Sequence, residues 1–290
     1  MKFDSLTLNR LKRLQLVARQ IKRGAIKGDR RSSRRGQSIE FADYRNYVPG
    51  DDLRRLDWNI YARHERPFIK LMEDEEDLAV YIILDGSLSM DWGEGDENKF
   101  AFGCRLAAGL GVVSLFTGDL LRLEIWGTET RLGPMRGQAN LTRLLASLGE
   151  AETAGEIDFH REARQFSKVN KRPGLLILIS DFLFPGGYEA GLKHLQGQGH
   201  EIILLQTLTP EELDPSLNGD LRLVDIETGA SQNVSVTPWI RNLYIERVKV
   251  WQSEIREFCN RRQIRYFNLN ASEAWDHFLL YEMRRSGALE

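Results

Sequence analysis

From residue 77 to the end of the chain, short continuous apolar runs alternate with longer segments of helical periodicity. The runs at 78–84 and 174–180 are strand-sized, and further strands are predicted at 119–127, 200–208 and 263–270. Helices are predicted at 98–116, 140–151, 158–169, 187–199, 238–261 and 272–285, and an edge strand at 220–229. Apolar strands alternating with helices are typical of a mostly parallel sheet covered on both faces, so we expect an α/β fold.

The first 76 residues have a different pattern. Apolar residues recur at helical spacing over 5–27, which predicts a basic amphipathic helix, and a polar linker follows up to residue 37. From about 39 to 70 the chain has short aromatic-rich pieces broken by "VPGDD", which favour a small antiparallel β-region. We therefore expect three parts, at 1–37, 38–76 and 77–290.

Composition places the chain in the ordinary soluble globular class. It has 290 residues, of which 42% are apolar and 28% charged. Cys104 and Cys259 are too few for a disulfide framework, so we expect two buried thiols in a reducing compartment. No apolar run approaches the roughly 20 residues that span a bilayer, and the charged N-terminus does not resemble a secretory signal. A cytoplasmic protein without disulfides or a transmembrane segment is expected.

The net charge of −2 conceals a strongly basic N-terminal segment. Residues 1–39 contain twelve Lys or Arg against two acidic residues. Such a segment can bind nucleic acid or an anionic membrane, or lie against an acidic surface of its own protein or of a partner. No aromatic residue interleaves the charges between Phe3 and Phe41, which disfavours nucleic acid.

Two predicted strands end in an acid. Asp85 follows "VYIIL" and Asp181 follows "LLILIS", and in open α/β sheets the carboxyl ends of the strands form the binding crevice. Two carboxylates about 5 Å apart would repel by roughly 3 kcal/mol at an effective dielectric near 20, and a bound cation relieves this repulsion. The hydroxyls of Ser87 and Ser89 complete an all-oxygen set that suits Mg²⁺. The alternative is that Asp85, Ser87 and Ser89 only form a turn or cap the next helix.

Other chemistries fit less well. A haloacid-dehalogenase-type phosphatase requires a second acid where Ser87 stands, and the Gly-x-Ser-x-Gly pattern of a serine hydrolase is missing from "DGSLSM". The five histidines show no zinc spacing, and the chain has no Gly-rich phosphate-binding loop. A metal-dependent phosphoester hydrolase would need a further base, for which "DWGEGDEN" offers Asp91, Glu94 and Asp96.

Two motifs carry a resemblance to known families. The Asp-x-Ser-x-Ser pattern with a later strand-end Asp resembles the metal-ion-dependent adhesion site of von Willebrand factor A domains. Upstream, "RNYVPGDDLRRLDWNIYAR" is similar to the motif of the bacterial domain-of-unknown-function family 58 (DUF58), whose members are typically encoded beside MoxR-type AAA+ ATPases. The resemblance implies a von Willebrand factor A-like doubly wound, mostly parallel sheet with helices on both faces, preceded by a small β-rich region and a basic helix.

Carried over by position, the resemblance implies that Asp85, Ser87 and Ser89 form the first metal loop and that Asp181 belongs to the third. The second loop normally supplies a Thr, and in "RGQANLTRLLASL" only Asn140 and Thr142 lie near the expected place. Either could be a ligand through a shifted loop, and Asn140 is equally suited to cap the following helix. Many relatives carry two transmembrane helices before the shared region, so this chain resembles a soluble version.

The motif "YVPGDDLRRLDW" alternates acidic and basic residues around a tight-turn signal. This alternation favours an internal ion-pair network with Trp58 as its apolar anchor, and a partner-binding surface is the other interpretation.

These features together favour a binding module over an enzyme. Mg²⁺ or Mn²⁺ held at the sheet edge would keep a position open for an Asp or Glu carboxylate of a protein partner. The resemblance implies that this partner is a MoxR-type AAA+ ATPase or its client, so the protein would act as an adaptor in chaperone-like assembly. The alternatives are the Mg²⁺-dependent hydrolase, and attachment to nucleic acid or membrane through the basic helix.

Overall fold

The computed structural model describes residues 3–19, 40–48, 56–64, 66–73, 78–226 and 229–290. It divides into two compact units, one formed by residues 1–21 and 78–290 and the other by residues 22–77.

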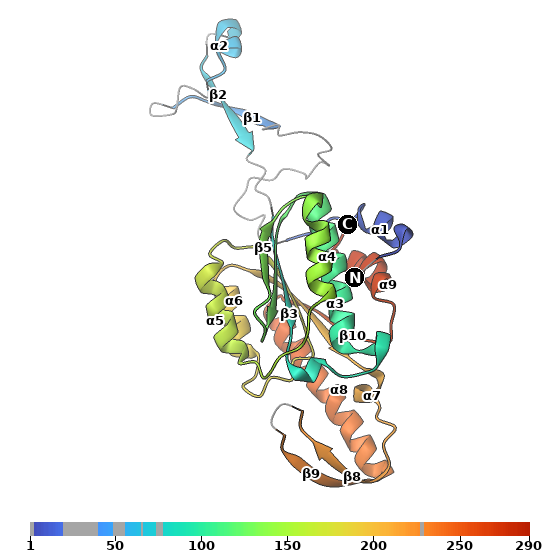
Figure 1. The fold of residues 1–290 in the computed structure, drawn as a ribbon. Coiled ribbons are helices and arrows are strands. Elements are labelled where there is room, and N and C mark those ends of the chain that lie inside the picture. The colour runs from blue at the N-terminus through green and yellow to red at the C-terminus, as the bar shows by residue number, and fades with distance from the viewer. Residues whose placement is uncertain (1–2, 20–39, 49–55, 65, 74–77, 227–228) are drawn as a thin grey trace. The chain divides into compact units, whose positions relative to one another are not determined.

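The larger unit is built around a six-stranded sheet with the order β10-β7-β6-β3-β4-β5 (Figure 1). The strands are β3 (Ala79–Asp85), β4 (Leu120–Trp126), β5 (Arg131–Met135), β6 (Leu175–Ser180), β7 (Glu201–Leu208) and β10 (Arg265–Asn270). All neighbours run parallel except β5, an antiparallel edge strand that the sequence pattern did not predict. The predicted α/β class with a mostly parallel sheet is confirmed.

Helices cover both faces of this sheet, which explains why every residue of β3, β6 and β7 is buried. One face carries α3 (Lys99–Thr117), α4 (Leu141–Gly149), and α9 (Trp275–His277), which continues into the π-helix η6 (Phe278–Met283). The other face carries α5 (Phe159–Val169), α6 (Glu189–Gly197) and the C-terminal part of α8 (Pro238–Arg261). The sheet therefore separates two apolar cores.

Helix α3 is the most deeply buried helix of the unit. By length and composition alone it could cross a membrane, and it is the one helix among the described residues that passes this test. However, 78% of its apolar window is buried inside the fold, as is usual for the core helix of an α/β domain. Its Cys104 and the Cys259 of α8 are free and buried, as predicted, and burial raises the pKa of each thiol to about 12.

The N-terminal segment differs from the predicted helix over 5–27. Helix α1 spans only Ser5–Leu11, capped by the Asp4 carboxylate, which accepts hydrogen bonds from the Leu6 and Thr7 amides. Beyond it, Leu14, Leu16 and Ala18 alternate toward the core, and residues 15 and 17 pair with the backbone of residues 288 and 290. The helical prediction was wrong over residues 12–19, because this strand-like pairing with the C-terminus buries Leu14, Leu16 and Ala18 at a period of two. Residues 20–27 of the predicted helix lie outside the described residues.

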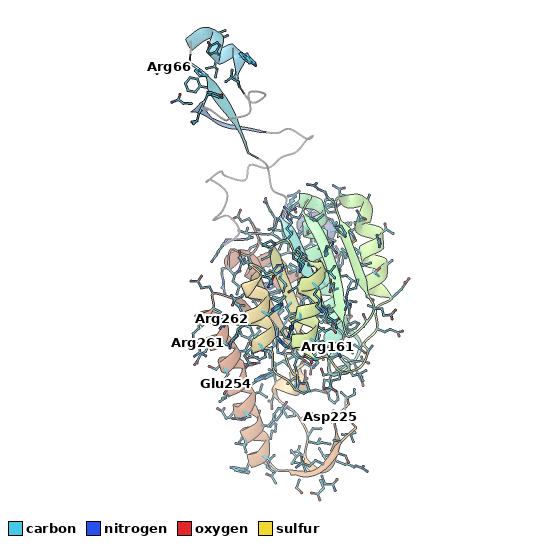
Figure 2. The ribbon with its side chains drawn as sticks, turned by 90° about the vertical axis from the view of Figure 1, so that its left-hand side faces the viewer. Arg66, Arg161, Asp225, Glu254, Arg261 and Arg262 are labelled. Atoms are coloured by element: carbon cyan, nitrogen blue, oxygen red, sulfur yellow. The ribbon has the colours of Figure 1, made fainter. Side chains whose placement is uncertain are left out.

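The predicted edge strand near 220–229 is also placed differently. Strand β8 (Gly219–Val224) pairs with β9 (Ser231–Val236) in a separate two-stranded hairpin and does not join the main sheet. The hairpin lies between the short helix α7 (Pro210–Leu213) and α8, and Figure 2 shows Asp225 at its end. Glu254, Arg261 and Arg262 mark the C-terminal half of α8 in the same view, and Arg262 bonds to Gln196 of α6.

The smaller unit contains the antiparallel pair β1 (Glu40–Asn46) and β2 (Phe68–Glu73), which the sequence predicted, and α2 (Trp58–His64), which it did not. Within this unit Trp58 is 62% exposed and packs edge-to-face against Tyr61. The neighbouring Leu56 and Asp57 are buried, and Asp57 accepts a hydrogen bond from the Ile60 amide at the start of α2. Asp51, Asp52, Arg54 and Arg55 of the predicted ion-pair network lie outside the described residues.

Candidate metal centre

The two strand-end acids lie next to each other at the carboxyl edge of the sheet. Strands β3 and β6 are neighbours in parallel register, with Leu84 opposite Ile179. This register brings the last residue of β6 to the last residue of β3, and Ser180 Oγ lies 2.5 Å from Asp85 Oδ2. Asp181 follows directly. The predicted convergence of the two strand ends is therefore seen in the structure.

The Asp85 carboxylate is held on both sides. Its Oδ1 accepts a hydrogen bond from the Ser87 amide at 2.9 Å, and its Oδ2 accepts the Ser180 hydroxyl. Burial, and secondly the negative charge of Asp181, raise the pKa of Asp85 to about 6, against the lowering effect of the Ser180 and Ser87 hydrogen bonds. Asp85 thus carries a negative charge that its surroundings only partly compensate.

The loop after β3 brings two hydroxyls to this edge. Ser87 Oγ and Ser89 Oγ lie 3.0 Å apart at the entry to the single turn η3 (Leu88–Met90). Gly86 permits this path, because a side chain there would approach the Trp126 carbonyl oxygen to 2.7 Å. The Gly86 amide donates a hydrogen bond to that same carbonyl at 3.0 Å, which holds the loop against the end of β4.

Asp181 begins the loop after β6 and is almost completely buried. Its Oδ1 accepts a hydrogen bond from the Leu183 amide at 3.0 Å, and its backbone carbonyl accepts one from Gln206 at 3.0 Å. Gln206 in turn accepts a hydrogen bond from the Tyr266 hydroxyl. The Leu183 amide orients the Asp181 carboxylate, and the contacts from β7 and β10 hold the backbone of Asp181 in place.

Lys99 is a member of this site that the sequence interpretation missed. Its Nζ lies 2.7 Å from Asp181 Oδ2 and 2.6 Å from Oε1 of Glu212 on α7. Burial lowers the pKa of Lys99, but the carboxylates of Asp181 and Glu212 together raise it above its ordinary value. The available signal was a lysine placed at the start of an otherwise apolar helix, where the helix dipole disfavours a positive charge.

The structure does not bring Asn140 and Thr142 to this edge. Strand β5 runs antiparallel, and its last residue, Met135, pairs with Leu121 near the start of β4. The turn η5 (Gln138–Asn140) and α4 therefore begin at the amino edge of the parallel strands, opposite the acids. Asn140 donates to the Arg136 carbonyl at 2.7 Å and makes no side-chain cap, and Thr142 is exposed. The assignment of either residue to the second metal loop is wrong, because the unpredicted strand reverses the chain before them.

The segment that does lie against the first loop is the connection between α4 and α5. The Ala154 amide donates to the Gly86 carbonyl at 2.7 Å, and the Leu88 amide donates to the Gly155 carbonyl at 3.2 Å. Thr153 is the hydroxyl residue of this segment and is partly buried. The signal that could have identified it is a threonine beside a glycine in the loop that returns to the carboxyl edge before the helix leading to β6.

The polar side chains of the acidic loop after Ser89 bond to one another and to the start of α3. The Asn98 side chain donates to Asp91 at 2.9 Å and caps α3 by accepting from the Ala101 amide, and Arg105 pairs with Asp96 at 2.9 Å. The turn η4 (Gly95–Glu97) lies between them. Asp91, Glu94 and Asp96 are all exposed, and the described partners of Asp91 and Asp96 lie within this loop and the first turns of α3.

Residues 43–254 match the family described as "Protein of unknown function DUF58". The chain belongs to the DUF58 family. A relative is the uncharacterized protein Rv1480 of Mycobacterium tuberculosis, 26% identical over 286 residues, which cover 96% of this chain and 90% of that protein. An uncharacterized protein of Mycobacterium avium is 22% identical over 52% of this chain and 90% of its own length.

Two solved structures are similar to this DUF58 protein. The conserved hypothetical protein BatB from Bacteroides thetaiotaomicron is 14% identical, with a TM-score of 0.46, over 72% of this chain and 98% of its own. An aerotolerance-related membrane protein from Bacteroides fragilis is also 14% identical, with a TM-score of 0.44, over 72% of this chain and 97% of its own.

The donor set of this DUF58 protein suits a hard divalent cation. Among the described residues there is no group of three or more His, Cys, Asp or Glu side chains arranged to hold a metal. The edge instead combines two buried carboxylates with the Ser87 and Ser89 hydroxyls, so its possible ligands are oxygen atoms. Oxygen ligands with room for water are what Mg²⁺ and Mn²⁺ accept. The residues present therefore fit such an ion, although Lys99 already pairs with one oxygen of Asp181.

Proposed function

We propose that this DUF58 protein is a non-enzymatic, metal-dependent protein-binding module. Asp85, Ser87, Ser89 and Asp181 would hold Mg²⁺ or Mn²⁺, and Thr153 replaces Asn140 and Thr142 as the candidate from the second loop. The ion would supply one electrophilic position for an Asp or Glu carboxylate of the partner. The observation that carries the proposal is the convergence of Asp85 and Asp181 with two serine hydroxyls at one sheet edge.

The hairpin β8–β9 and the first half of α8 support a protein as the partner. They follow β7 and α7, and therefore leave the sheet at the edge where the acids lie (Figure 1). Trp239 is 71% exposed, and Val224, Leu223 and Leu243 are also largely exposed. Exposed apolar side chains gathered on one projection are typical of protein-interaction surfaces, and a partner contacting them would reach the metal edge.

The family resemblance names a candidate partner. Members of the DUF58 family are typically encoded beside MoxR-type AAA+ ATPases. We therefore propose that such an ATPase or its client provides the carboxylate. A role in chaperone-like assembly in the cytoplasm follows from this pairing.

Titration calorimetry with Mg²⁺ and Mn²⁺ tests the metal. The wild type and Asp91→Ala, a change in the exposed loop, should bind the ion, and Asp85→Ala should not. Featureless titrations of all three proteins would remove the metal from the proposal.

Binding of the purified MoxR-type ATPase from the same organism tests the partner. The full chain should retain it in Mg²⁺ and lose it in a chelator or as Asp85→Ala. Equal binding under all these conditions would show that the metal edge is not the contact.

A further inference from the structure

Lys99 is placed where a lysine is doubly unfavourable. Its side chain has no exposed surface, and it stands at the first position of α3, where the partial positive charge of the helix terminus repels an ammonium. A buried charge is retained only when strong partners compensate it. Here the partners are two carboxylates within 2.7 Å. Lys99 is therefore held in place by the charge of this edge.

The two partners of Lys99 differ in kind. Asp181 belongs to the proposed metal site, whereas Glu212 lies outside it on α7. The other oxygen of Glu212 accepts from the Thr209 amide at 2.9 Å and from the Thr209 hydroxyl at 3.2 Å, in a complete capping box. Glu212 is thus fixed independently of Asp181 and remains a partner for the ammonium when a cation takes the Asp181 oxygen.

The sum of the charges at this edge also allows a divalent cation beside Lys99. Asp85, Asp181 and Glu212 bring three carboxylates to the edge, and Lys99 brings one ammonium. With all of them ionised, two negative charges are left, which one divalent cation balances. A positive charge this close to a bound ion opposes it strongly, because the repulsion between like charges a few ångströms apart is only weakly screened in a buried site.

We infer that Lys99 is the resident cation of this edge: it neutralises Asp181 when no metal is bound, and it lowers the affinity of the site for a divalent ion. The inference rests on the proposed metal site and adds the residue that tunes it. The ammonium would then compensate one carboxylate in the metal-free protein, and the ion would bind weakly enough to depend on the partner's carboxylate.

Mn²⁺ titrations and thermal unfolding of Lys99→Met test the inference, with Lys193→Met on the exposed side of α6 as the matched control. Lys99→Met should bind Mn²⁺ at least about tenfold more tightly than the wild type, because a repelling charge is gone. In a chelator its unfolding temperature should fall, because Asp181 and Glu212 are left buried without a counter-ion, and Mn²⁺ should restore it. Lys193→Met should match the wild type in both measurements.

The double variant Lys99→Met/Glu212→Gln covers the case in which Lys99→Met does not fold. It removes one charge of each sign, so it should unfold at a higher temperature than Lys99→Met in chelator. It should still bind Mn²⁺ more tightly than Glu212→Gln, which keeps the ammonium.

The outcomes separate the inference from the proposed function. Equal or weaker Mn²⁺ binding by the lysine-free variants, with a wild type that binds, overturns the role of Lys99 and leaves the metal site standing. Binding by the lysine-free variants alone supports Lys99 as the resident cation and removes the metal from the proposed function. No binding by any variant overturns both.

Discussion

Ser180 Oγ lies 2.5 Å from Asp85 Oδ2, so the last residues of two neighbouring strands are joined through their side chains. The same hydroxyl oxygen accepts a hydrogen bond from the Phe182 amide at 2.8 Å, and its own proton therefore goes to Asp85. Ser180 in this way links the direction of the loop after β6 to the ionisation of the acid at the end of β3.

Ser180→Ala should raise the pKa of Asp85 above about 6, because a hydrogen bond that favours the carboxylate is lost. Mn²⁺ affinity should then fall by about threefold near pH 6.5, with little change near pH 8.5, where Asp85 is ionised in both proteins. Calorimetry across this pH range measures the effect. Ser167→Ala, which removes a buried hydroxyl bonded to the Ala163 carbonyl within α5, is the control and should leave the profile unchanged. Superimposable profiles of Ser180→Ala and the wild type would contradict the role of the hydroxyl.

The pH dependence of stability follows from the pKa of Asp85, which is raised from its ordinary value of 3.8 to about 6. A carboxyl with a raised pKa in the folded state contributes stability that is complete below about 3.8 and is lost as pH rises through 6. In chelator, Asp85→Asn should therefore be more stable than the wild type by on the order of 2–3 kcal/mol near pH 8, and this gain should disappear near pH 4. Urea unfolding at the two pH values measures it. Asp91→Asn should show no such crossover, and a constant difference for Asp85→Asn would contradict the cause.

Two threonines test which segment supplies the second metal loop. Thr153→Val should weaken Mn²⁺ binding by about tenfold or more, because it removes a hydroxyl from the segment that bonds to Gly86 and Leu88. Thr142→Val should not change the affinity, because Thr142 is exposed at the opposite end of the sheet. Calorimetry of both variants measures the two affinities. A larger loss for Thr142→Val than for Thr153→Val would favour Thr142 as the second-loop ligand.

The N-terminal segment should be part of the fold. Leu16→Ala should destabilise the protein by about 2–4 kcal/mol, because Leu16 is completely buried between the core and the C-terminal residues. Leu6→Ala should change the unfolding free energy by less than about 0.5 kcal/mol, because Leu6 is 59% exposed. Urea unfolding compares the two. Equal, small effects would show that residues 12–19 are not anchored as described.

This anchoring also decides how a nucleic-acid or membrane role should be tested. Deletion of the N-terminus would remove Leu11, Leu14 and Leu16 from the core, so a loss of binding would report unfolding. Reversal of charge at Arg10 and Arg13 leaves these leucines in place. Salt-sensitive binding to DNA or anionic vesicles that these changes abolish would support attachment through this segment.

The sequence by itself determined the central layer of this protein. The continuous apolar runs at β3, β6 and β7 bury all of their side chains only in a sheet that is covered on both faces. Local composition therefore implies the architecture. The same reasoning placed Asp85 and Asp181 at one edge, because parallel strands end on the same side. These conclusions need the direction of each strand and no knowledge of distant contacts.

Only the tertiary structure decided the rest, and the reason is the same in each case: the deciding contact joins segments far apart in the chain. Strand β5 is short, and of its residues only Met135 is buried, so no apolar run indicates the chain reversal. This reversal places Asn140 and Thr142 at the other edge and leaves Thr153 as the candidate in their place. Leu14 and Ala18 fit a helical period as well as an alternating one, and the pairing of residues 15 and 17 with residues 288 and 290 selects the alternating one. The role of Lys99 was not predicted, because its partners Asp181 and Glu212 lie 82 and 113 positions away and meet it only when the sheet is assembled.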